Sequence, residues 1–499
     1  MKASENKVRL SDATVSLLDE RVRRPAYDRK KLRARTVHMG VGGFHRAHQA
    51  VYLDDLLERG ALTDWGECGM GILPHDAAMR DALREQGYLY TVLERSADRQ
   101  AARIIGSIMD FSLAPEDAEA AIQRLANEDV HLVSLTITEG GYFLHEGTGE
   151  FLHDDPSILH DIQQPNAPRT SLGYITAALK RRRERNIRPF TVMSCDNLQG
   201  NGHVVRKVLL GLAELQDVTL RRWIADNVAF PNSMVDRITP ATTSNDREQL
   251  LHNFGIDDAW PVVTEPFRQW VIEDTFCNAR PPWEEVGAEI VTDVLPYELM
   301  KIRLLNASHM AMAYLGALDG YTYAHEVMQD TVFHEFIQAF MEEVTPVVPL
   351  IPDTSIPNYK RTLIERFANP TINDRVARLC SEGSAKMPKW VVPSIVELAE
   401  KRNSTRLLSL VIAAWIKYLQ SPVDNRGSAI EVVDARAGEL KRATESIGDD
   451  PRPFLAMKSL FGPAYFGEPA FANDVETALK SLSIDGVKKT IRRYTAAAH

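Results

Sequence analysis

Two hydrophobic patterns alternate along the first half of the chain. Short apolar or β-branched runs, each about the length of one strand, are separated by stretches with helical periodicity. The strand-like runs span 36–40, 68–73, 88–93, 130–138 and 190–194, and the helical stretches span 47–58, 115–126 and 171–185. This alternation predicts a doubly wound α/β fold with a largely parallel sheet.

The pattern changes after about residue 282. Strand signals almost vanish, and amphipathic or buried helical stretches follow at 297–318, 330–344, 360–367, 392–401, 407–419 and 474–482. The segment 280–285 holds two consecutive prolines, which continue neither a helix nor a central strand. We therefore expect an α/β domain over 1–284 and a mainly α-helical domain over 285–499.

Composition and charge narrow the class of partner. The chain has 499 residues, 44% of them hydrophobic and 25% charged, which is typical of a globular protein with a large core. Lysine and arginine number 58 against 68 aspartates and glutamates, so the net charge of −10 offers no basic surface for nucleic acid or anionic lipid. No uncharged apolar run approaches the roughly 18 residues of a membrane span. We expect a cytoplasmic protein whose partner is a small molecule, with no nucleic acid and no membrane.

The four cysteines carry little chemistry. They are scattered singly, and no Cys-x-x-Cys pair supplies half of a zinc site or a redox motif. We expect reduced, mostly buried thiols. The pattern also argues against zinc-dependent alcohol dehydrogenase chemistry, which needs cysteine and histidine ligands around one open metal position, and we expect no metal.

A glycine-rich segment, Gly-Val-Gly-Gly-Phe-His-Arg-Ala at 40–47, follows the first predicted strand and opens a helical stretch. In a dinucleotide site the first glycine, here Gly40, permits a tight turn, and the second, Gly42, lets the backbone approach the pyrophosphate at a helix N-terminus. The usual third glycine is replaced by His45. A plain turn is therefore the alternative, but the position after the first strand of an α/β pattern favours a Rossmann-type nucleotide site.

Asp76 follows the second predicted strand, about 30 residues beyond the glycines. A carboxylate at that place can accept hydrogen bonds from the adenosine ribose hydroxyls, although the usual separation is about 20 residues. Capping of the helical stretch 77–84 is the alternative. No lysine or arginine is adjacent to Asp76 in sequence, which favours NAD over NADP.

The helical stretch 296–309 groups four polar residues. At about 100° per residue, Glu298, Lys301, Asn306 and His309 fall within one arc of about 140°. A solvent-exposed stripe is the alternative, but the leucines and methionines around them indicate burial. Burial lowers the pKa of a lysine, and a neutral amine can take the proton from an alcohol as hydride leaves. Asn306 could then hold the substrate oxygen, and His309 could donate to it or orient it.

Beyond these motifs, the chain resembles the polyol-specific long-chain dehydrogenase/reductase (mannitol dehydrogenase) family nearly end to end. The most specific matches are 40–49, 134–142, 194–198, 230–240 and 301–309. The resemblance implies a Rossmann-type NAD-binding domain followed by a helical substrate-binding and catalytic domain. It also implies NAD(H)-dependent, metal-independent oxidation of D-mannitol at C2 to D-fructose, and the reverse reduction. We expect a monomer.

The resemblance also assigns individual roles. It implies that Lys301 is the general acid/base, that Asn197 and Asn306 stabilise the oxyanion, and that His309 binds the reacting hydroxyl. Residues implied to contact the other polyol hydroxyls are Asp236, Arg378 and Lys386. For the cofactor, we expect contacts from Gly40, Gly42, Gly43, Phe44 and Asp76.

Other interpretations stay open at this point. Asp236 could form a local ion pair with Arg237, and Arg378 and Lys386 could decorate a helix end and a loop. Within the family, the alternatives are a reductase of fructuronate or tagaturonate and a dehydrogenase of arabinitol or sorbitol. A different class is a non-catalytic nucleotide-binding sensor on the same fold.

Overall fold

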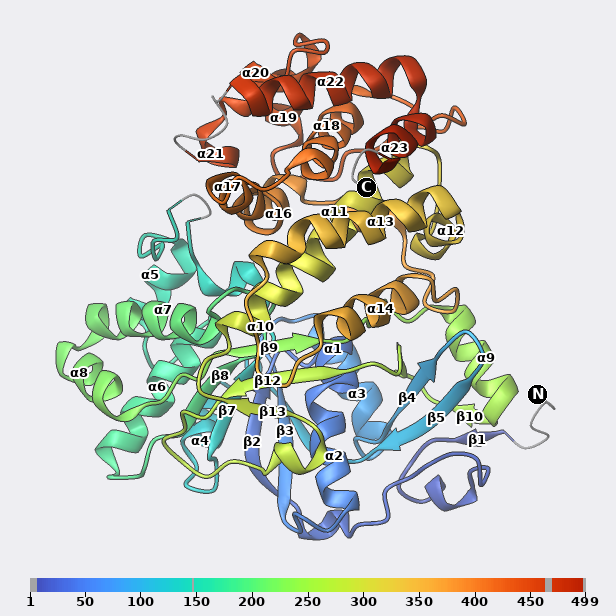
Figure 1. Ribbon diagram of the computed structural model, residues 1–499. Coiled ribbons are helices and arrows are strands. Elements are labelled where there is room, and N and C mark those ends of the chain that lie inside the picture. The colour runs from blue at the N-terminus through green and yellow to red at the C-terminus, as the bar shows by residue number, and fades with distance from the viewer. Residues whose placement is uncertain (1–6, 146–147, 463–468, 497–499) are drawn as a thin grey trace. The chain divides into compact units, whose positions relative to one another are not determined.

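The computed structural model describes residues 7–145, 148–462 and 469–496 of the chain (Figure 1). These residues form two compact units, which divide between Leu295 and Pro296. The first unit combines helices with strands, and the second is built from helices. Within the described ranges, no helix combines the length and the apolar character that crossing a membrane requires.

A five-stranded parallel sheet forms the centre of the first unit (Figure 1). Its strands, in spatial order, are β6 (Ile108–Leu113), β3 (Trp65–Gly71), β2 (Arg33–Met39), β7 (Leu132–Leu135) and β8 (Thr191–Ser194). In chain order this is third, second, first, fourth, fifth, the order of a Rossmann fold. The predicted fold class is therefore confirmed, and the strand order reverses between β2 and β7.

Different helices cover the two faces of this sheet. On one face, apolar side chains of β2, β3, β7 and β8 share a buried core with α4 (Ala118–Ala126), α6 (Ser171–Glu184) and α7 (Asn201–Gln216). On the other face lie α1 (Gly43–Ala47) and α2 (Gln49–Glu58). Side chains alternate along a strand, so neighbouring positions serve opposite faces and the strands read as continuous apolar runs.

The remaining helices of the first unit lie around this core. They are α3 (Asp76–Glu85), α5 (Pro156–Gln163), α8 (Val218–Asn227) and α9 (Ser244–Phe254). Several helices begin at a side-chain cap. Asp117 accepts from the backbone N–H of Ala120 at the start of α4, and Thr170 accepts from that of Gly173 at the start of α6.

One predicted strand lies outside the central sheet. The run at 88–93 is β4 (Tyr90–Arg95), which pairs antiparallel with β5 (Gln100–Ile105) and parallel with β11 (Val262–Thr264). The strand that comes third along the chain in the central sheet is β6, and the hydrophobic pattern did not predict it. A third sheet consists, in spatial order, of β13 (Glu289–Val291), β12 (Gln269–Glu273) and β9 (Ser233–Asp236), and β1 (Val8–Arg9) pairs with β10 (Ile256–Asp257). An apolar run identifies a strand, but its hydrogen-bond partners come from the tertiary fold.

The second unit is mainly helical, as predicted. A continuous helix consists of α10 (Leu295–Met300), the π-helical segment η5 (Lys301–Asn306) and α11 (Ala307–Leu318). The other helices of eight or more residues are α13 (Thr331–Val344), α14 (Ile356–Phe367), α16 (Gly383–Trp390), α17 (Val392–Glu400), α18 (Arg406–Gln420), α19 (Ala437–Glu445), α22 (Pro469–Asp485) and α23 (Val487–Ala496). Shorter helical segments are α12 (Ala324–Gln329), α15 (Val376–Cys380), α20 (Arg452–Leu455) and α21 (Lys458–Phe461). Almost all of α18 is buried, and it packs against α11 and α22.

The boundary between the units follows a strand. β13 (Glu289–Val291) comes after the two prolines and pairs in parallel with β12 (Gln269–Glu273), so it belongs to the first unit. A division at 284/285 falls inside the 3₁₀ turn η4 (Trp283–Val286), whereas the first compact unit ends at Leu295.

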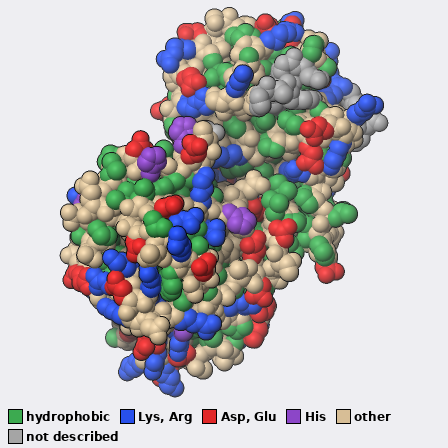
Figure 2. Space-filling model, turned by 90° about the vertical axis from the view of Figure 1, so that its left-hand side faces the viewer, with side chains coloured by type: hydrophobic (Ala, Val, Ile, Leu, Met, Phe, Trp, Pro, Cys, Tyr) green, Lys and Arg blue, Asp and Glu red, His purple; other side chains and the backbone are tan. Residues whose placement is uncertain are grey.

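The distribution of charged side chains and the burial of the cysteines agree with the expectations from the sequence. Lys and Arg side chains are interspersed with Asp and Glu over the face shown in Figure 2. All four cysteines are free thiols: Cys68, Cys195 and Cys380 are buried and Cys277 is partly buried. The expected burial of most of the thiols is confirmed.

Candidate active site

Two loops meet at the carboxyl ends of β2 and β7, where the strand order reverses. Gly40 begins the first loop, directly after β2, with φ of +88°, and a Cβ built on it would lie 2.2 Å from the carbonyl oxygen of Thr136. The Thr136 hydroxyl donates to the carbonyl of Gly40 at 2.7 Å. Only glycine fits this approach, and a crevice at such a switch point is where doubly wound folds bind ligands.

Gly42 differs from Gly40 in what surrounds it. Its backbone is extended, with φ of −109°, and the nearest atom to a Cβ built there is the Gly40 oxygen at 3.8 Å. The protein itself therefore does not require glycine at 42. Gly42 is exposed and directly precedes α1, so an absent Cβ leaves room for a ligand at the helix start. Gly43 is the first residue of α1, and Phe44 stacks on the His48 ring with centroids 5.0 Å apart.

His45 occupies the place of the motif's third glycine, whose usual role is close packing of helix on strand. In this structure a buried histidine ring, and not a glycine, packs the helix on the strands. The His45 ring is fully buried and stacks on the ring of His38 in β2, with centroids 3.4 Å apart. Its Nε2 lies 2.5 Å from Oε1 of Glu67 in β3. The segment Gly40–Ala47 is therefore anchored to two strands by polar side chains.

Asp76 holds the loop after β3. Its Oδ2 accepts hydrogen bonds from the backbone N–H groups of Ile72 at 2.9 Å and Leu73 at 3.0 Å. These groups lie before α3, and His75 rather than Asp76 is the residue at the N-cap. Oδ1 lies 3.8 Å from Nε2 of His75. The carboxylate thus stands at the carboxyl end of the second Rossmann strand, where ribose-binding acids are placed.

A buried carboxylate orders the loop beyond β7. Asp196 accepts the backbone N–H groups of Ile137 at 3.0 Å and Thr138 at 2.9 Å, and the hydroxyl of Tyr142 at 2.6 Å. Thr138 has φ of +61° and ψ of 168°, a region that is nearly restricted to glycine. Strain of this kind persists only where neighbours hold it, and Asp196 does so. Asn197, which is exposed, directly follows this anchored residue.

Asp236 ends β9 (Ser233–Asp236) and is buried. The next residue, Arg237, forms an ion pair with Glu94 at 2.5 Å and also donates to the carbonyl oxygens of Ala47 and Glu265. Arg237 therefore forms its ion pair with Glu94 of β4.

In the second unit, the four polar residues expected on one face are all buried. The exposed fractions are 6% for Glu298, 8% for Lys301, 4% for Asn306 and 9% for His309, so the exposed-stripe alternative is excluded. The His309 ring also contacts the Phe367 ring, with centroids 4.6 Å apart.

The π-helical segment changes the expected arc. On an α-helix, residue i+5 lies about 140° around the axis from residue i. Lys301 and Asn306 are related in this way, but they are the two ends of η5, where the N–H of Ala307 bonds to the carbonyl of Ile302 five residues back. A π turn holds more residues than an α turn, so Asn306 comes closer to the face of Lys301. Such segments are frequent at functional sites.

Arg378 and Lys386 lie near one another in the second unit. The guanidinium of Arg378 forms two hydrogen bonds to Asp374, both 2.6 Å, which fixes its orientation. Nζ of Lys386 lies 3.5 Å from the carbonyl oxygen of Arg378 and 3.3 Å from that of Leu379, and it sits over the ring of Trp390. Burial, and then the neighbouring Arg378, lower the pKa of Lys386.

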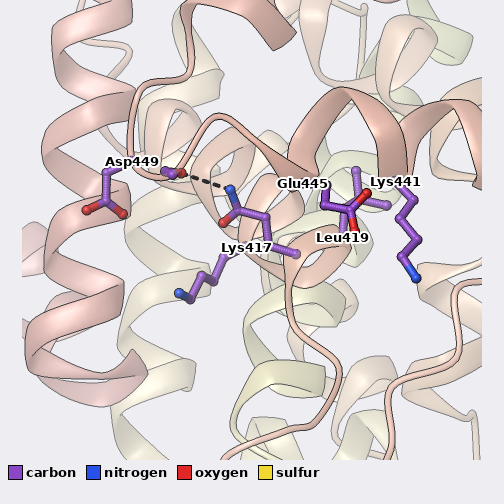
Figure 3. Close-up of a pocket in the computed structure, with 7 residues that line it drawn as sticks. Lys417, Leu419, Lys441, Glu445 and Asp449 are labelled. Carbon is purple, nitrogen blue, oxygen red and sulfur yellow. Dashed lines mark hydrogen bonds between the residues drawn. The ribbon is translucent and has the colours of Figure 1, made fainter.

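Two other features of the described residues give no evidence for a further site. A surface hollow of about 270 Å³ lies beside α18 and α19, where Lys417 and Lys441 alternate with Glu445 and Asp449 (Figure 3). It holds charges of both signs and none of the candidate residues. Nowhere in the described ranges do three or more histidine, cysteine, aspartate or glutamate side chains gather as a metal-binding group.

Sequence reasoning missed three of the residues that shape these loops: Thr136, Asp196 and Glu67. The first two lie in segments that resemble the family, and their signal is position: Thr136 lies within the predicted strand run 130–138, and Asp196 lies two residues after the run 190–194. Glu67 gives no such signal, because a single acid inside an apolar strand shows its partner only in the folded chain.

Comparison with known proteins identifies the family. Residues 34–285 match the family model "Mannitol dehydrogenase Rossmann domain", and residues 293–483 match "Mannitol dehydrogenase C-terminal domain". The mannitol 2-dehydrogenase of Aspergillus oryzae is 46% identical over 483 residues, covering 95% of this chain and 96% of that protein. That of Neosartorya fischeri is 47% identical over 480 residues, covering 95% of each.

Solved structures support the same family. The ternary complex of Pseudomonas fluorescens mannitol 2-dehydrogenase with NAD and D-mannitol has a TM-score of 0.88 and 45% sequence identity, covering 97% of this chain and 99% of that one. A substrate-free D-sorbitol dehydrogenase has a TM-score of 0.88 and 32% identity, covering 97% of this chain and 100% of that one. Both family models and full-length relatives thus match the two units that the fold shows, and the chain belongs to the mannitol dehydrogenase family.

Proposed function

We propose that this protein is an NAD(H)-dependent oxidoreductase that interconverts D-mannitol and D-fructose at C2. The observation that carries the proposal on this chain is the buried face of Lys301, Asn306 and His309 on a π-helical segment. It is supported by the 45% identity to a relative whose structure contains NAD and D-mannitol.

The first unit fits a dinucleotide. The extended Gly42 next to the start of α1 leaves space that no protein atom needs, so backbone N–H groups there can face a pyrophosphate. Gly40, Gly43 and Phe44 would line the same loop. Asp76, at the end of the second strand, would accept the ribose hydroxyls, which favours NAD over a cofactor with a 2′-phosphate.

In the oxidation direction, the neutral amine of Lys301 accepts the proton of the C2 hydroxyl. Burial of Lys301 supports this role, because desolvation favours an uncharged amine. Bound NAD supplies the acceptor for the hydride that leaves C2. His309 donates to the reacting oxygen and orients it. In reduction the same lysine returns the proton.

The amides of Asn197 and Asn306 donate to the substrate oxygen as it gains negative charge. Such donors act mainly in the transition state. The loop that Asp196 orders supports the position of Asn197, and the π turn supports that of Asn306.

Asp236, Arg378 and Lys386 would contact the remaining hydroxyls of the polyol. The two hydrogen bonds from Arg378 to Asp374 suit a neutral substrate, because part of the guanidinium's charge is already paired. The lowered pKa of Lys386 acts in the same direction.

The assignment includes three further statements. We assign a monomer. The reaction uses a lysine as acid/base and no metal. The four free thiols agree with a reducing compartment, and we assign the protein to the cytoplasm.

A second candidate is sorbitol oxidation, which the 32% identity and equal TM-score of the D-sorbitol dehydrogenase favour. The deciding experiment is steady-state kcat/KM with NAD for mannitol and sorbitol, and with NADH for fructose and fructuronate. We expect mannitol and fructose to give the highest values. A higher value for sorbitol or for fructuronate overturns the mannitol assignment, and no turnover with any of them leaves a nucleotide-binding protein without this catalysis.

A further inference from the structure

A buried polar cluster lies on the face of the central sheet that α1 covers. His38 in β2, Glu67 in β3 and Ser134 in β7 alternate with apolar residues that face α4 and α6, so their side chains point to the opposite face. His45 in α1 completes the cluster. The exposed fractions of the four are 0%, 3%, 2% and 0%.

The cluster is connected to the glycine loop by hydrogen bonds. His38 Nδ1 lies 2.8 Å from Ser134 Oγ, and its Nε2 lies 2.8 Å from Thr136 Oγ1. Because the Thr136 hydroxyl gives its hydrogen to the carbonyl of Gly40, His38 must carry its proton on Nε2. The His38 ring in turn stacks on His45, which contacts Glu67. The cluster thus runs from the carboxyl group of Glu67 to the loop backbone.

Glu67 is the group in this cluster that can change its charge near neutral pH. Among the described residues, no lysine or arginine pairs with its carboxyl group. Burial raises the pKa of Glu67 to about 7 and lowers that of His45 to about 3. Protonated Glu67 donates to Nε2 of a neutral His45, and the ionised form has no compensating cation.

The other titratable groups around Glu67 stay neutral at this pH. Burial holds the pKa of His38 well below its usual value and raises those of Tyr90 and Cys195. Arg46, which follows His45 in α1, lowers the pKa of that histidine further; its guanidinium donates to the carbonyl of Trp260 and lies over the Tyr90 ring.

We infer that Glu67 couples proton binding to cofactor binding: the protein binds the dinucleotide more tightly when Glu67 is protonated. The inference rests on the proposed function, in which the pyrophosphate faces the loop and the first turn of α1. Glu67 touches His45 in that same short helix, so a carboxylate there opposes an anionic ligand, whereas the neutral acid does not. His45 and Glu67 are positioning residues for the loop.

The test is the affinity for NADH without substrate, measured by fluorescence titration from pH 6 to pH 9. For the wild type, we expect Kd to rise between pH 6 and pH 8, by up to about tenfold, which is the limit for one ionisation near pH 7 when the bound form stays protonated. Glu67→Gln keeps a donor toward His45 and stays neutral, so its Kd should match the wild-type value at pH 6 and vary little. As the matched control, Asp161→Asn removes another fully buried acid of the first unit, whose partner is Thr170, and should retain the wild-type pH dependence.

A second measurement needs no variant. Calorimetric titration with NADH at pH 7, in two buffers of different ionisation enthalpy, should show uptake of about half a proton per NADH bound. NADH binding without proton uptake, or a Glu67→Gln variant with the wild-type pH dependence, overturns the coupling alone. Failure of the wild type to bind NADH at any pH overturns the proposed function as well, so the two failures are distinguishable.

Discussion

Gly40 and Gly42 lie two residues apart, but substitution of each by alanine should impair a different property of the protein. Gly40 has a left-handed backbone, and its Cβ would meet the Thr136 carbonyl at 2.2 Å. Gly42 has φ of −109°, and its Cβ would lie 3.8 Å from the nearest atom. We therefore expect Gly40→Ala to lower stability and Gly42→Ala to lower cofactor affinity.

The magnitudes follow from these contacts. In Gly40→Ala, a left-handed backbone costs about 1–2 kcal/mol, and relieving the overlap with Thr136 costs about 1–3 kcal/mol. A loss of about 3 kcal/mol would lower the Tm of a unit of this size by about 5 °C. In Gly42→Ala the backbone is allowed and the space is open, so stability should change by less than about 0.5 kcal/mol.

The assays are thermal unfolding of the apo protein and fluorescence titration with NADH. Gly42→Ala should keep the wild-type Tm but raise Kd about tenfold or more, which corresponds to about 1.4 kcal/mol, because the methyl group fills the space left for the pyrophosphate. An unchanged Kd in Gly42→Ala would show that this glycine does not face the cofactor. A Gly40→Ala variant as stable as the wild type would refute the steric reasoning.

Three further results are expected. Lys301→Ala should retain NADH binding but keep less than about a tenth of wild-type turnover across neutral pH, since general-base catalysis contributes about 10²-fold or more; a larger residual rate in stopped-flow assays contradicts the role. Asn306→Ala should lower the rate constant of hydride transfer about a hundredfold or more with a smaller change in substrate binding, and an effect confined to KM would reassign it. The folded-state pKa of Glu67, about 7, exceeds its ordinary value of 4.5, so its contribution to stability is full below pH 4.5 and is lost as pH rises to 7, a change of about 3 kcal/mol. Urea unfolding at pH 5, 6, 7 and 8 should show this fall in the wild type and a smaller fall in Glu67→Gln.

Much of the fold follows from local sequence. The run at 36–40 and the glycines after it predict a strand, a turn and a helix start, because apolar runs, glycine turns and helix starts are properties of a few adjacent residues. The helices of the second unit are predicted for the same reason. The burial of Lys301 is also predictable, since the residues around it leave no polar face for solvent.

The tertiary structure decided the features that depend on distant partners. The run at 88–93 is a strand in sequence and in structure, but only its pairing with β5 and β11 placed it outside the central sheet. The π turn at Lys301–Asn306 replaces the α-helical angles, and no residue type in that segment marks it. His45 reads as a missing glycine in the sequence, and its reason becomes visible only when Glu67, 22 residues further on, lies 2.5 Å away. Local patterns encode backbone preference and burial, whereas a hydrogen bond between side chains far apart in the chain forms only after the strands have paired.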